Sequence, residues 1–559
     1  MRAWRLGTLV LLFLLVALPL AMPIAAFVRQ PSAMQALLDG TRLLILTRNT
    51  ALLIIGALII AVPPGILLAI LLYRTDLPFR RLLRWLIFMT LFVPLPLFAS
   101  GWQAALGSGG WITIPAWTTG DSAWTPWAQG VLAACWIHGL AGLPWIVLLV
   151  GQGLCWVERE LEEEALMVVG PWSVLRKVTL RRAGASLGAA LIWVAILTAT
   201  EITVTDMMQV RTFAEEVYNQ FTRPEVGQSV ALGLASALAV NLPAIAVCWI
   251  LLWTAMRRFE QGLPPLDRLS STSPLLFRLG QWRWPLLILT GLLCGFVLGV
   301  PLGSLVWKAG STPAQPWSKD ILSYHLATTL HIRGGLIGES VLWAAVAGTL
   351  VAGLALVVCW LATDSRWMRQ IILLFVVTAW VIPGPVVGIG LKETINLLMD
   401  LTHSGTLADA LYYGYSPLPL LWAYLLRFFP AAVALLWPVV RLMPRELIEA
   451  ARVDGASPSQ ELSRVVWPLT ALPLLMASLS VAVLALGELS ASKLVETPGS
   501  QTFAHEVFTQ MHYGVTNDLA ALCLWLLLAL TGGATAVSLI YFYPSKPIIF
   551  GGEQRTTNN

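Results

Sequence analysis

Residues 449–455 read EAARVDG, and the stretch continues as ASPSQELSRVVWPL to Leu469. It is charged and punctuated by glycine, whereas the chain around it is strongly apolar. Of the 559 residues, 57% are apolar and only 12% are charged, which is far from the composition of a soluble globular protein. We therefore expect this stretch to lie outside the lipid, between two spans of a membrane protein.

Apolar stretches of roughly 20 residues, the length that a helix needs to cross a bilayer, recur about twelve times. The expected spans are 6–29, 49–73, 85–103, 127–151, 184–201, 227–255, 284–307, 337–362, 370–391, 416–440, 470–487 and 517–543. Backbone in lipid must satisfy its own hydrogen bonds, so each span is expected to be helical. The sequence thus predicts an all-α polytopic membrane protein with about 12 transmembrane helices.

The first span also has features of a signal peptide, because Arg2 and Arg5 precede an apolar run that contains small residues at Ala21, Ala25 and Ala26. The run is longer than the ~7–15 residues of a usual signal-peptide core. We therefore expect it to be a retained first helix.

The distribution of Lys and Arg predicts the orientation. If both termini are cytoplasmic, most of the 35 basic residues fall in segments on the cytoplasmic side, as the positive-inside rule requires. This arrangement also places EAARVDG in the cytoplasm. The net charge of +5 mainly reflects this excess and gives no reason to expect nucleic-acid binding.

The cysteines lie in or beside apolar runs and have no paired short spacing. They are Cys135, Cys155, Cys248, Cys294, Cys359 and Cys523. We interpret them as small hydrophobic residues rather than as disulfides or metal ligands.

A less complete copy of EAARVDG, EALMVVG, occurs at residues 164–170. Both begin with Glu-Ala and end with Gly. Glu164 and Glu449 are 285 residues apart. Other motifs recur at nearly the same separation: VPLP and IPGP, ATEI and LGEL, and RTFAEEV and QTFAHEV. This pattern predicts an internal repeat of about half the chain.

Six spans in each half would make the two halves parallel, with a pseudo-two-fold axis along the membrane normal and a pathway between them. We expect a first half at 1–255, a cytoplasmic linker rich in Arg, Ser and Pro at 256–283, and a second half at 284–559. Each half would carry one charged loop after its fourth span. These are loop 1, near 158–182, and loop 2, near 442–468.

Loop 2 has the signals of two short helices joined by a sharp bend. Pro444 and Arg445 open the first helix, and Gly455 tolerates the left-handed conformation of a helix end. Ser457 can cap the next helix, with Pro458 in its first turn. A hairpin that merely joins two spans is the simpler interpretation of one such loop, but two copies at matching places favour a function.

EAARVDGASPSQELSRVVWPL resembles the EAA loop of permease subunits from binding-protein-dependent ABC importers. In that family, Glu-Ala-Ala is followed after three residues by Gly and then, thirteen residues later, by Pro, as in Gly455 and Pro468. The first copy departs from this pattern, with Leu166 in place of the second Ala and Arg181 in place of the Pro. The preceding span, AYLLRFFPAAVALLWPVV, is similar to the ferric-iron and thiamine branch, in which fused two-half permeases are typical.

The resemblance implies that each loop is a coupling helix that docks on a cytoplasmic ABC ATPase dimer. The residues that it assigns to coupling are Glu164, Ala165, Gly170, Glu449, Ala450, Ala451, Gly455 and Pro468. The chain contains no Gly-Lys dipeptide and hence no GxxxxGK[ST] phosphate loop. We therefore expect a transport subunit of the inner membrane that binds no cofactor and is not an enzyme, with ATP hydrolysed by the partner.

The resemblance also implies that an extracytoplasmic binding protein delivers the solute. Ferric iron is the leading substrate by branch resemblance, and thiamine, a polyamine or an oxyanion are the alternatives.

Ionisable residues inside spans are costly and point to function. Arg427 lies within the span LLRFFP, where it either lines a pathway that accepts anions, pairs with an acid, or snorkels to the interface. Glu201 and Glu488 lie near the outer ends of equivalent helices. We expect these two to cap and position helices rather than to contact substrate.

Five histidines fall in expected outside segments: His325, His331, His403, His505 and His512. Their spacing matches no compact ligand set, so we predict exposed loop residues and no metal site. The Trp-rich residues 110–130 resemble an interfacial aromatic belt, with contact to a binding protein as the alternative.

Two other classes of membrane protein compete with this interpretation. A major-facilitator-type secondary transporter also has twelve helices in two halves, but the loop YRTDLPFRRLLR lacks the glycines expected after its second helix, and this class does not explain paired EAA loops. A polytopic membrane enzyme would require clustered acids or histidines at one membrane face. The acidic run Glu162 to Glu164 belongs to loop 1 instead.

Overall fold

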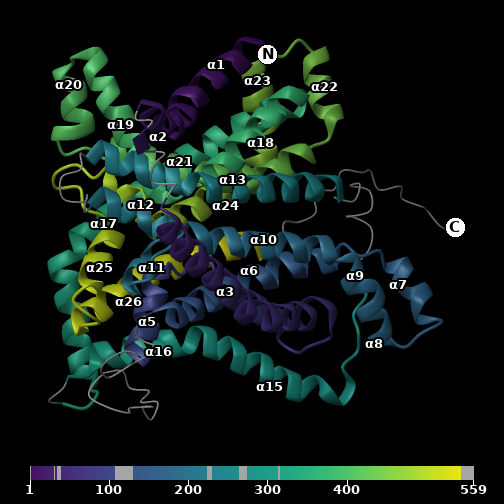
Figure 1. Cartoon of the computed structure of the whole chain (residues 1–559). Coiled ribbons are helices and arrows are strands. Elements are labelled where there is room, and N and C mark those ends of the chain that lie inside the picture. Colours follow the sequence, from purple (N-terminus) through teal and green to yellow (C-terminus); the bar gives the residue numbers. More distant parts are fainter. Residues whose placement is uncertain are drawn as a thin grey trace.

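The computed structural model describes residues 2–29, 32–33, 39–106, 130–222, 230–262, 274–312 and 315–542. Figure 1 shows that these residues form a bundle of helices. β-Pairing in the described ranges is limited to two isolated bridges. The Trp-rich residues 110–129 and the residues after Phe542 lie outside the described part of the chain.

The helices up to residue 262 are α1 (Arg2–Leu12), π-helix η1 (Phe13–Ala17), α2 (Leu18–Arg29), α3 (Gly40–Arg74), α4 (Arg80–Thr90), α5 (Leu95–Leu106), α6 (Val131–Cys155), α7 (Arg159–Leu166), α8 (Pro171–Val174), π-helix η3 (Leu175–Thr179), α9 (Leu180–Arg182), α10 (Gly184–Thr200), α11 (Thr203–Met207), α12 (Phe213–Thr222) and α13 (Val230–Gly262).

From residue 280 onward they are η4 (Gly280–Trp282), α15 (Arg283–Cys294), π-helix η5 (Gly295–Gly299), α16 (Val300–Gly310), α17 (Lys319–Thr363), α18 (Arg366–Val381), α19 (Gly384–Thr402), α20 (Gly405–Ala408), π-helix η6 (Asp409–Tyr413), α21 (Leu418–Arg441), α22 (Arg445–Val453), α23 (Pro458–Glu461), π-helix η7 (Leu462–Val466), α24 (Trp467–Leu486), η8 (Ser492–Leu494), α25 (Phe503–Met511) and α26 (Asn517–Phe542).

Within the described residues, nine helices are long and apolar enough to cross a membrane, or up to 12 if each of three bent pairs is one span. The chain is thus a multi-pass membrane protein. The expected spans 85–103 and 370–391 are not straight, however. The pairs α4–α5 and α18–α19 bend by 101° and 111°, respectively.

Both sharp bends fall at the proline motifs VPLP and IPGP. Before Pro383, Ile382 is extended with ψ 124°, because a following proline disfavours the helical conformation. Pro383 then caps α19, and Pro385 lies in its first turn. In the first half, α5 begins directly after Pro94, whose carbonyl accepts from Phe98 N at 3.0 Å. Proline therefore divides each of these spans into two helices.

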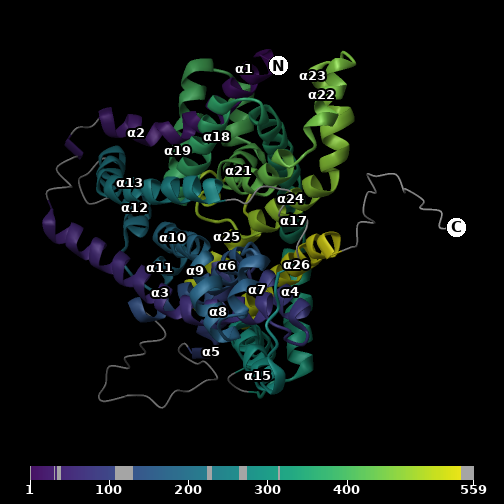
Figure 2. The same ribbon diagram turned by 90° about the vertical axis from the view of Figure 1, so that its right-hand side faces the viewer.

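The elements recur in the same order in the two halves. After the first span, the first half has α3, α4–α5, α6, α7–α8, α10, α12 and α13, and the second has α17, α18–α19, α21, α22–α23, α24, α25 and α26. Figures 1 and 2 place α7–α9 and α22–α23 toward one end of the molecule, at the right of Figure 1, and α12 and α25 toward the other. We call these the loop end and the opposite end.

The first span of each half packs against the other half. Helix α2 contacts α19, and α16 contacts α5. Two glycines permit this close approach: a Cβ on Gly101 would lie 2.6 Å from the Cβ of Pro301, and a Cβ on Gly390 would meet the carbonyl oxygen of Pro19. The largest apolar core cluster accordingly contains residues from both halves. The halves therefore form one packed body.

Parts of the expected linker 256–283 lie within the described residues. Helix α13 continues to Gly262, and residues 263–273 lie outside the described part. Phe277 N then donates to the carbonyl of Arg74 at 2.8 Å, and Leu279 N donates to Asp76 Oδ1 at 2.8 Å. The end of the linker is thus attached to the end of α3.

Candidate functional site in two loops and between the halves

Loop 2 consists of α22 and α23 joined by a turn in which Gly455 has φ +79°, the left-handed conformation that favours glycine. Ser457 and Gln460 form a reciprocal capping box at the start of α23, with Pro458 in its first turn. Glu449 and Ala450 are exposed on α22, and Ala451 is half-buried. This geometry presents small and acidic side chains on one rigid bend. Pro468 is exposed in the first turn of α24.

Loop 1 has the same two helices but a different bend. Gly170 precedes α8 in an extended conformation, with φ −68°, and is therefore not equivalent in backbone to Gly455. Met167, Val168 and Trp172 are 85%, 84% and 72% exposed. They form an apolar surface at the loop end, which is the kind of surface that marks a protein contact.

The residues that begin α7 and α22 give a more exact alignment of the two loops. Helix α7 begins RELEEEA and α22 begins RELIEAA. Aligning Arg159 with Arg445 places Glu163, rather than Glu164, opposite Glu449. Glu164 is exposed, and Ala165 is half-buried. Glu163 accepts from Arg159 Nε at 2.6 Å, an exposed i,i+4 pair of small energetic effect.

A buried carboxylate attaches loop 1 to the end of α3. Glu162 of α7 pairs with Arg74, and both side chains are fully buried. Thr179 Oγ1 donates to Glu162 Oε1 at 2.5 Å, and Arg74 Nη1 donates to the carbonyl of Leu154 at 2.9 Å. In the sequence, Glu162 is recognisable only as part of an acidic run, and its pairing with Arg74 was not predicted, because a buried charge looks like an exposed one in sequence.

Loop 2 is attached to the end of α17 in a related way. Trp360 Nε1 donates to Glu461 Oε1 at 2.8 Å, and Arg452 Nε donates to Glu461 Oε2 at 2.8 Å. The hydrogen bond to Glu461 raises the pKa of Arg452. Arg452 also donates to Asp364 Oδ2 at 2.7 Å. In both loops, a buried carboxylate thus fixes the short helices to the longest helix of that half.

Arg427 of α21 lies close to Glu488, with 3.9 Å between Arg427 Nε and Glu488 Oε1. Its Nη1 donates to the carbonyl of Ile382 at 3.5 Å, at the break between α18 and α19. In the first half, His138 Nε2 of α6 lies 3.6 Å from Glu201 Oε2. Each half therefore sets a side-chain nitrogen of its fourth-span helix near a glutamate.

Both glutamates accept backbone hydrogen bonds at helix starts. Glu201 accepts from Thr203 N at 2.6 Å and Val204 N at 3.0 Å. Glu488 accepts from Ala491 N at 2.8 Å and Ser492 N at 3.0 Å. These bonds satisfy donors that a helix start leaves unpaired. The carboxylates therefore position the backbone that follows α10 and α24.

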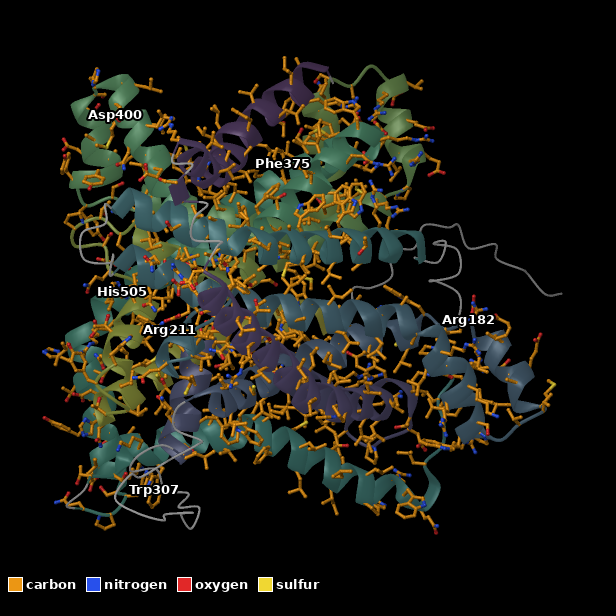
Figure 3. The ribbon with its side chains drawn as sticks, in the orientation of Figure 1. Arg182, Arg211, Trp307, Phe375, Asp400 and His505 are labelled. Carbon is orange, nitrogen blue, oxygen red and sulfur yellow. The ribbon has the colours of Figure 1, made fainter. Side chains whose placement is uncertain are left out.

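The opposite end carries one ion pair in each half with the same pattern. Arg42 of α3 pairs with Glu216 of α12, and Arg333 of α17 pairs with Glu506 of α25 at 2.9 Å. The glutamine four residues after each glutamate donates to it, Gln220 at 3.2 Å and Gln510 at 2.7 Å. Figure 3 labels Arg211 and His505 at this end and Arg182 at the loop end.

Two polar contacts at the opposite end join the halves. Lys493 Nζ donates to Tyr218 Oη at 2.9 Å, and His512 Nε2 lies 3.3 Å from Asp206 Oδ2. The described histidines do not converge: His505 pairs with Glu496, and His325 with Asp518. No group of three or more metal-ligating side chains occurs in the described ranges.

Residues 344–543 match the family model of the binding-protein-dependent transport system inner membrane component. The matched segment begins inside α17 and reaches the end of α26, so it contains loop 2, Arg427 and Glu488. Searches of curated proteins and of solved structures gave no match. With its multi-pass helical fold, the match supports a permease subunit of an ABC importer, a transport subunit of the inner membrane.

Proposed function

We propose that the whole chain is a fused two-half permease that moves a solute, delivered by an extracytoplasmic binding protein, through a pathway between its halves. The observation that carries this proposal is loop 2, whose EAA helix and glycine bend lie within the segment that matches the family model. The second support is the recurrence of elements. A serine or threonine on the long helix accepts from the first residue of the short helix in both halves, Thr50 from Phe213 N and Ser340 from Phe503 N.

We assign ATPase docking to both loops, with ATP hydrolysed by the partner dimer and no cofactor on this chain. Glu449 and Ala450 of loop 2 are exposed for contact, and Met167, Val168 and Trp172 of loop 1 offer an apolar surface. Glu162 pairs with Arg74 of α3, and Glu461 accepts from Trp360 of α17. These contacts support coupling of loop movement to the spans, because a loop fixed to a long helix moves with that helix. The proposal places both loops and both termini in the cytoplasm.

We place the pathway near Arg427, Glu201 and Glu488. The Arg427 side chain is 23% exposed, whereas Glu488 is 4% exposed and engaged with backbone. The Glu201 side chain is 12% exposed, so Arg427 has the most surface available to a passing solute among the three. The two glutamates act as positioning residues for the helices beside it.

We propose ferric iron as the solute, on the resemblance of the span before loop 2 to the iron and thiamine branch. Uptake of radioactive iron should fall when the gene for this chain is deleted and return when the gene is supplied. Thiamine, a polyamine and an oxyanion are tested in the same cells. A defect confined to one of these three would replace iron by that solute.

The test of coupling is purification of the tagged full chain from its native membranes, followed by mass spectrometry of the proteins that accompany it. We expect an ABC ATPase with the wild type and its loss with Glu449→Lys or Gly455→Val. The changes Glu164→Lys and Gly170→Val, in the EALMVVG copy of loop 1, should reduce ATPase retention less, because this copy of the motif is degenerate.

Retention of the ATPase by all four variants would contradict the coupling role of these residues. A preparation without any ATPase that moved solute along an ion gradient would instead favour a major-facilitator-type secondary transporter.

A further inference from the structure

The two glutamates between the halves are each followed, five residues later, by a side chain that contacts the other half. Glu201 is followed by Asp206, and Glu488 is followed by Lys493. Each glutamate accepts hydrogen bonds from backbone N–H groups in between, so it positions the side chain that follows. Figure 1 shows the helices concerned, α11, α12 and α25, toward the opposite end.

Asp206 and Lys493 each contact the short helix of the other half or the residue that ends it. Asp206 Oδ2 lies 3.3 Å from Nε2 of His512, the residue that follows α25. Lys493 Nζ donates to Tyr218 Oη of α12 at 2.9 Å, and it lies 4.4 Å from the ring centre of Phe508 in α25. The two contacts between the halves therefore occupy equivalent places in the repeat.

The contact of His512 with Asp206 requires a proton that a neutral histidine does not supply. Nδ1 of His512 lies 2.9 Å from the carbonyl oxygen of Phe508, and because a carbonyl only accepts, this nitrogen carries a hydrogen. A neutral imidazole has a single N–H, so its Nε2 would present a lone pair to the carboxylate oxygen. A hydrogen bond between Nε2 and Oδ2 therefore holds one additional proton, which makes the contact an imidazolium–carboxylate pair.

The charged groups around this contact include more carboxylates than cations. Glu201 and Glu215 interact electrostatically with Asp206 and favour a proton beside it. The ammonium of Lys493, which shares an aromatic neighbour with His512, opposes that proton. Helix α5, which packs against α25, has no charged residue. Charged side chains on α25 and on the neighbouring α17 and α26 form ion pairs of their own: Arg333 with Glu506, His325 with Asp518, and His505 with Glu496.

We propose that the contact of His512 with Asp206 is a proton-dependent closure of the outer end of the pathway between the halves. The added proton holds α11 and α25 together, and its loss releases them, so the outer end opens more readily as pH rises. His512 and Asp206 are thus positioning residues for transport. The contact of Lys493 with Tyr218 closes the same end without this proton. The inference rests on the proposed function, which places a pathway between the halves, and it adds control by the pH outside the membrane.

The test measures the distance between the halves at the opposite end by electron paramagnetic resonance. Spin labels are attached to the purified full chain in detergent at Thr47→Cys in α3 and Tyr513→Cys beside His512, both at exposed positions. The six native cysteines are buried or half-buried and are poorer targets for the label. Between pH 5.5 and pH 8, the ratio of the longer to the shorter distance should rise by roughly 1.5- to 5-fold, the range for one exposed ion pair.

Two variants examine the proton itself. Asp206→Asn makes it unnecessary, because the amide can donate to a neutral Nε2 and accept from an imidazolium. Its distances should be the same at both pH values and match those of the wild type at pH 5.5. His512→Ala changes a side chain that is 47% exposed, so the fold should tolerate it. It should show the longer distance at both pH values.

Two controls keep the proton-dependent contact. Glu215→Gln removes another acid near Asp206, but one whose carboxylate accepts from Asn219 of its own helix. Lys493→Met removes the other contact between the halves and should increase the longer distance at both pH values. Both variants should retain the pH dependence of the wild type.

Identical wild-type distances at pH 5.5 and pH 8 would overturn the proposal, as would a pH dependence that persists in Asp206→Asn or His512→Ala. The proposed transport function fails in a different way. If the distances follow the expected pattern in a chain that co-purifies with no ATPase, the proton-dependent contact stands and the importer function is contradicted.

Discussion

Gly101 and Pro301 lie in opposite halves of the chain and touch through their backbones, since a Cβ on Gly101 would fall 2.6 Å from the Cβ and 2.8 Å from the carbonyl oxygen of Pro301. The contact between Gly390 and Pro19 has the same form with the halves exchanged. Each half is therefore held by the first span of the other.

We expect Gly101→Ala and Gly390→Ala to destabilise the protein by about 1–3 kcal/mol each, because overpacking forces neighbouring backbone apart. The measurement is the melting temperature of the purified chain in detergent. Gly188→Ala in α10 is the matched control, since a Cβ there meets nothing within 4 Å. Equal melting temperatures for Gly101→Ala and Gly188→Ala would refute the close contact.

The buried pair of Arg74 and Glu162 predicts a large loss on removal of one partner. Glu162→Gln should reduce the free energy of unfolding by about 3–5 kcal/mol, because it leaves the guanidinium of Arg74 buried without a counter-ion. Glu163→Gln removes the exposed partner of Arg159 and should lower the free energy of unfolding by less than about 1 kcal/mol. Similar melting temperatures for the two variants would show that Arg74 finds another partner.

The two loop glycines should differ in their tolerance of a side chain. Gly455→Ala places a Cβ in the left-handed region and should cost about 1–2 kcal/mol locally, with weaker retention of the ATPase. Gly170→Ala should have little effect, since its backbone is extended and a Cβ there meets nothing within 4 Å. The readout is the amount of ATPase that co-purifies, and the reverse order of effects would contradict the assignment of the bend.

Arg427 and Glu488 should be energetically coupled. In a double-mutant cycle with Arg427→Met and Glu488→Gln, we expect an interaction free energy of about 0.5–3 kcal/mol, the range for residues in one charged network. Melting temperatures of the wild type, the two single variants and the double variant supply the four corners of the cycle. If the effects of the two single substitutions add up to that of the double substitution, the contact between Arg427 and Glu488, 3.9 Å apart, contributes nothing to stability.

Glu215 of α12, outside the candidate spans, should make stability depend on pH. Burial, together with the nearby Glu216 and Asp206, raises its pKa from the ordinary 4.5 to about 7. The hydrogen bond from Asn219 to Oε1 opposes this rise only in part. Between those pH values the folded state keeps a proton that the unfolded state has released, so stability falls as pH rises through that window and levels off above it.

Glu215→Gln should therefore raise the melting temperature at pH 8 and leave it nearly unchanged at pH 4.5, which thermal unfolding at the two pH values can check. Glu216→Gln is the control, because it removes the ion pair with Arg42 and should lower the melting temperature at pH 8. A lower melting temperature for Glu215→Gln at pH 8 would mean that the carboxylate is stabilised when charged.

The sequence predicted the features that depend on composition and on local conformation. Apolar length predicted the spans, since a helix must cover a fixed thickness of lipid. The residue types of Gly455, Ser457 and Pro458 predicted the bend of loop 2, because backbone conformation and capping are local properties. The motifs VPLP and IPGP were recognised from the sequence as equivalent positions of the repeat. In the structure the helices break there, at Pro94 and Pro383, and these breaks were not predicted.

What only the tertiary structure decided are the contacts between residues far apart in the chain. The burial of Glu162 against Arg74, the approach of Gly101 to Pro301 and the contact of Arg427 with Glu488 all join elements that sequence spacing leaves unrelated. The sequence does not show whether a charged or small residue faces water, lipid or another helix. Packing alone determines which of these surroundings it has, and hence whether its charge is paired, buried or left to bind a ligand.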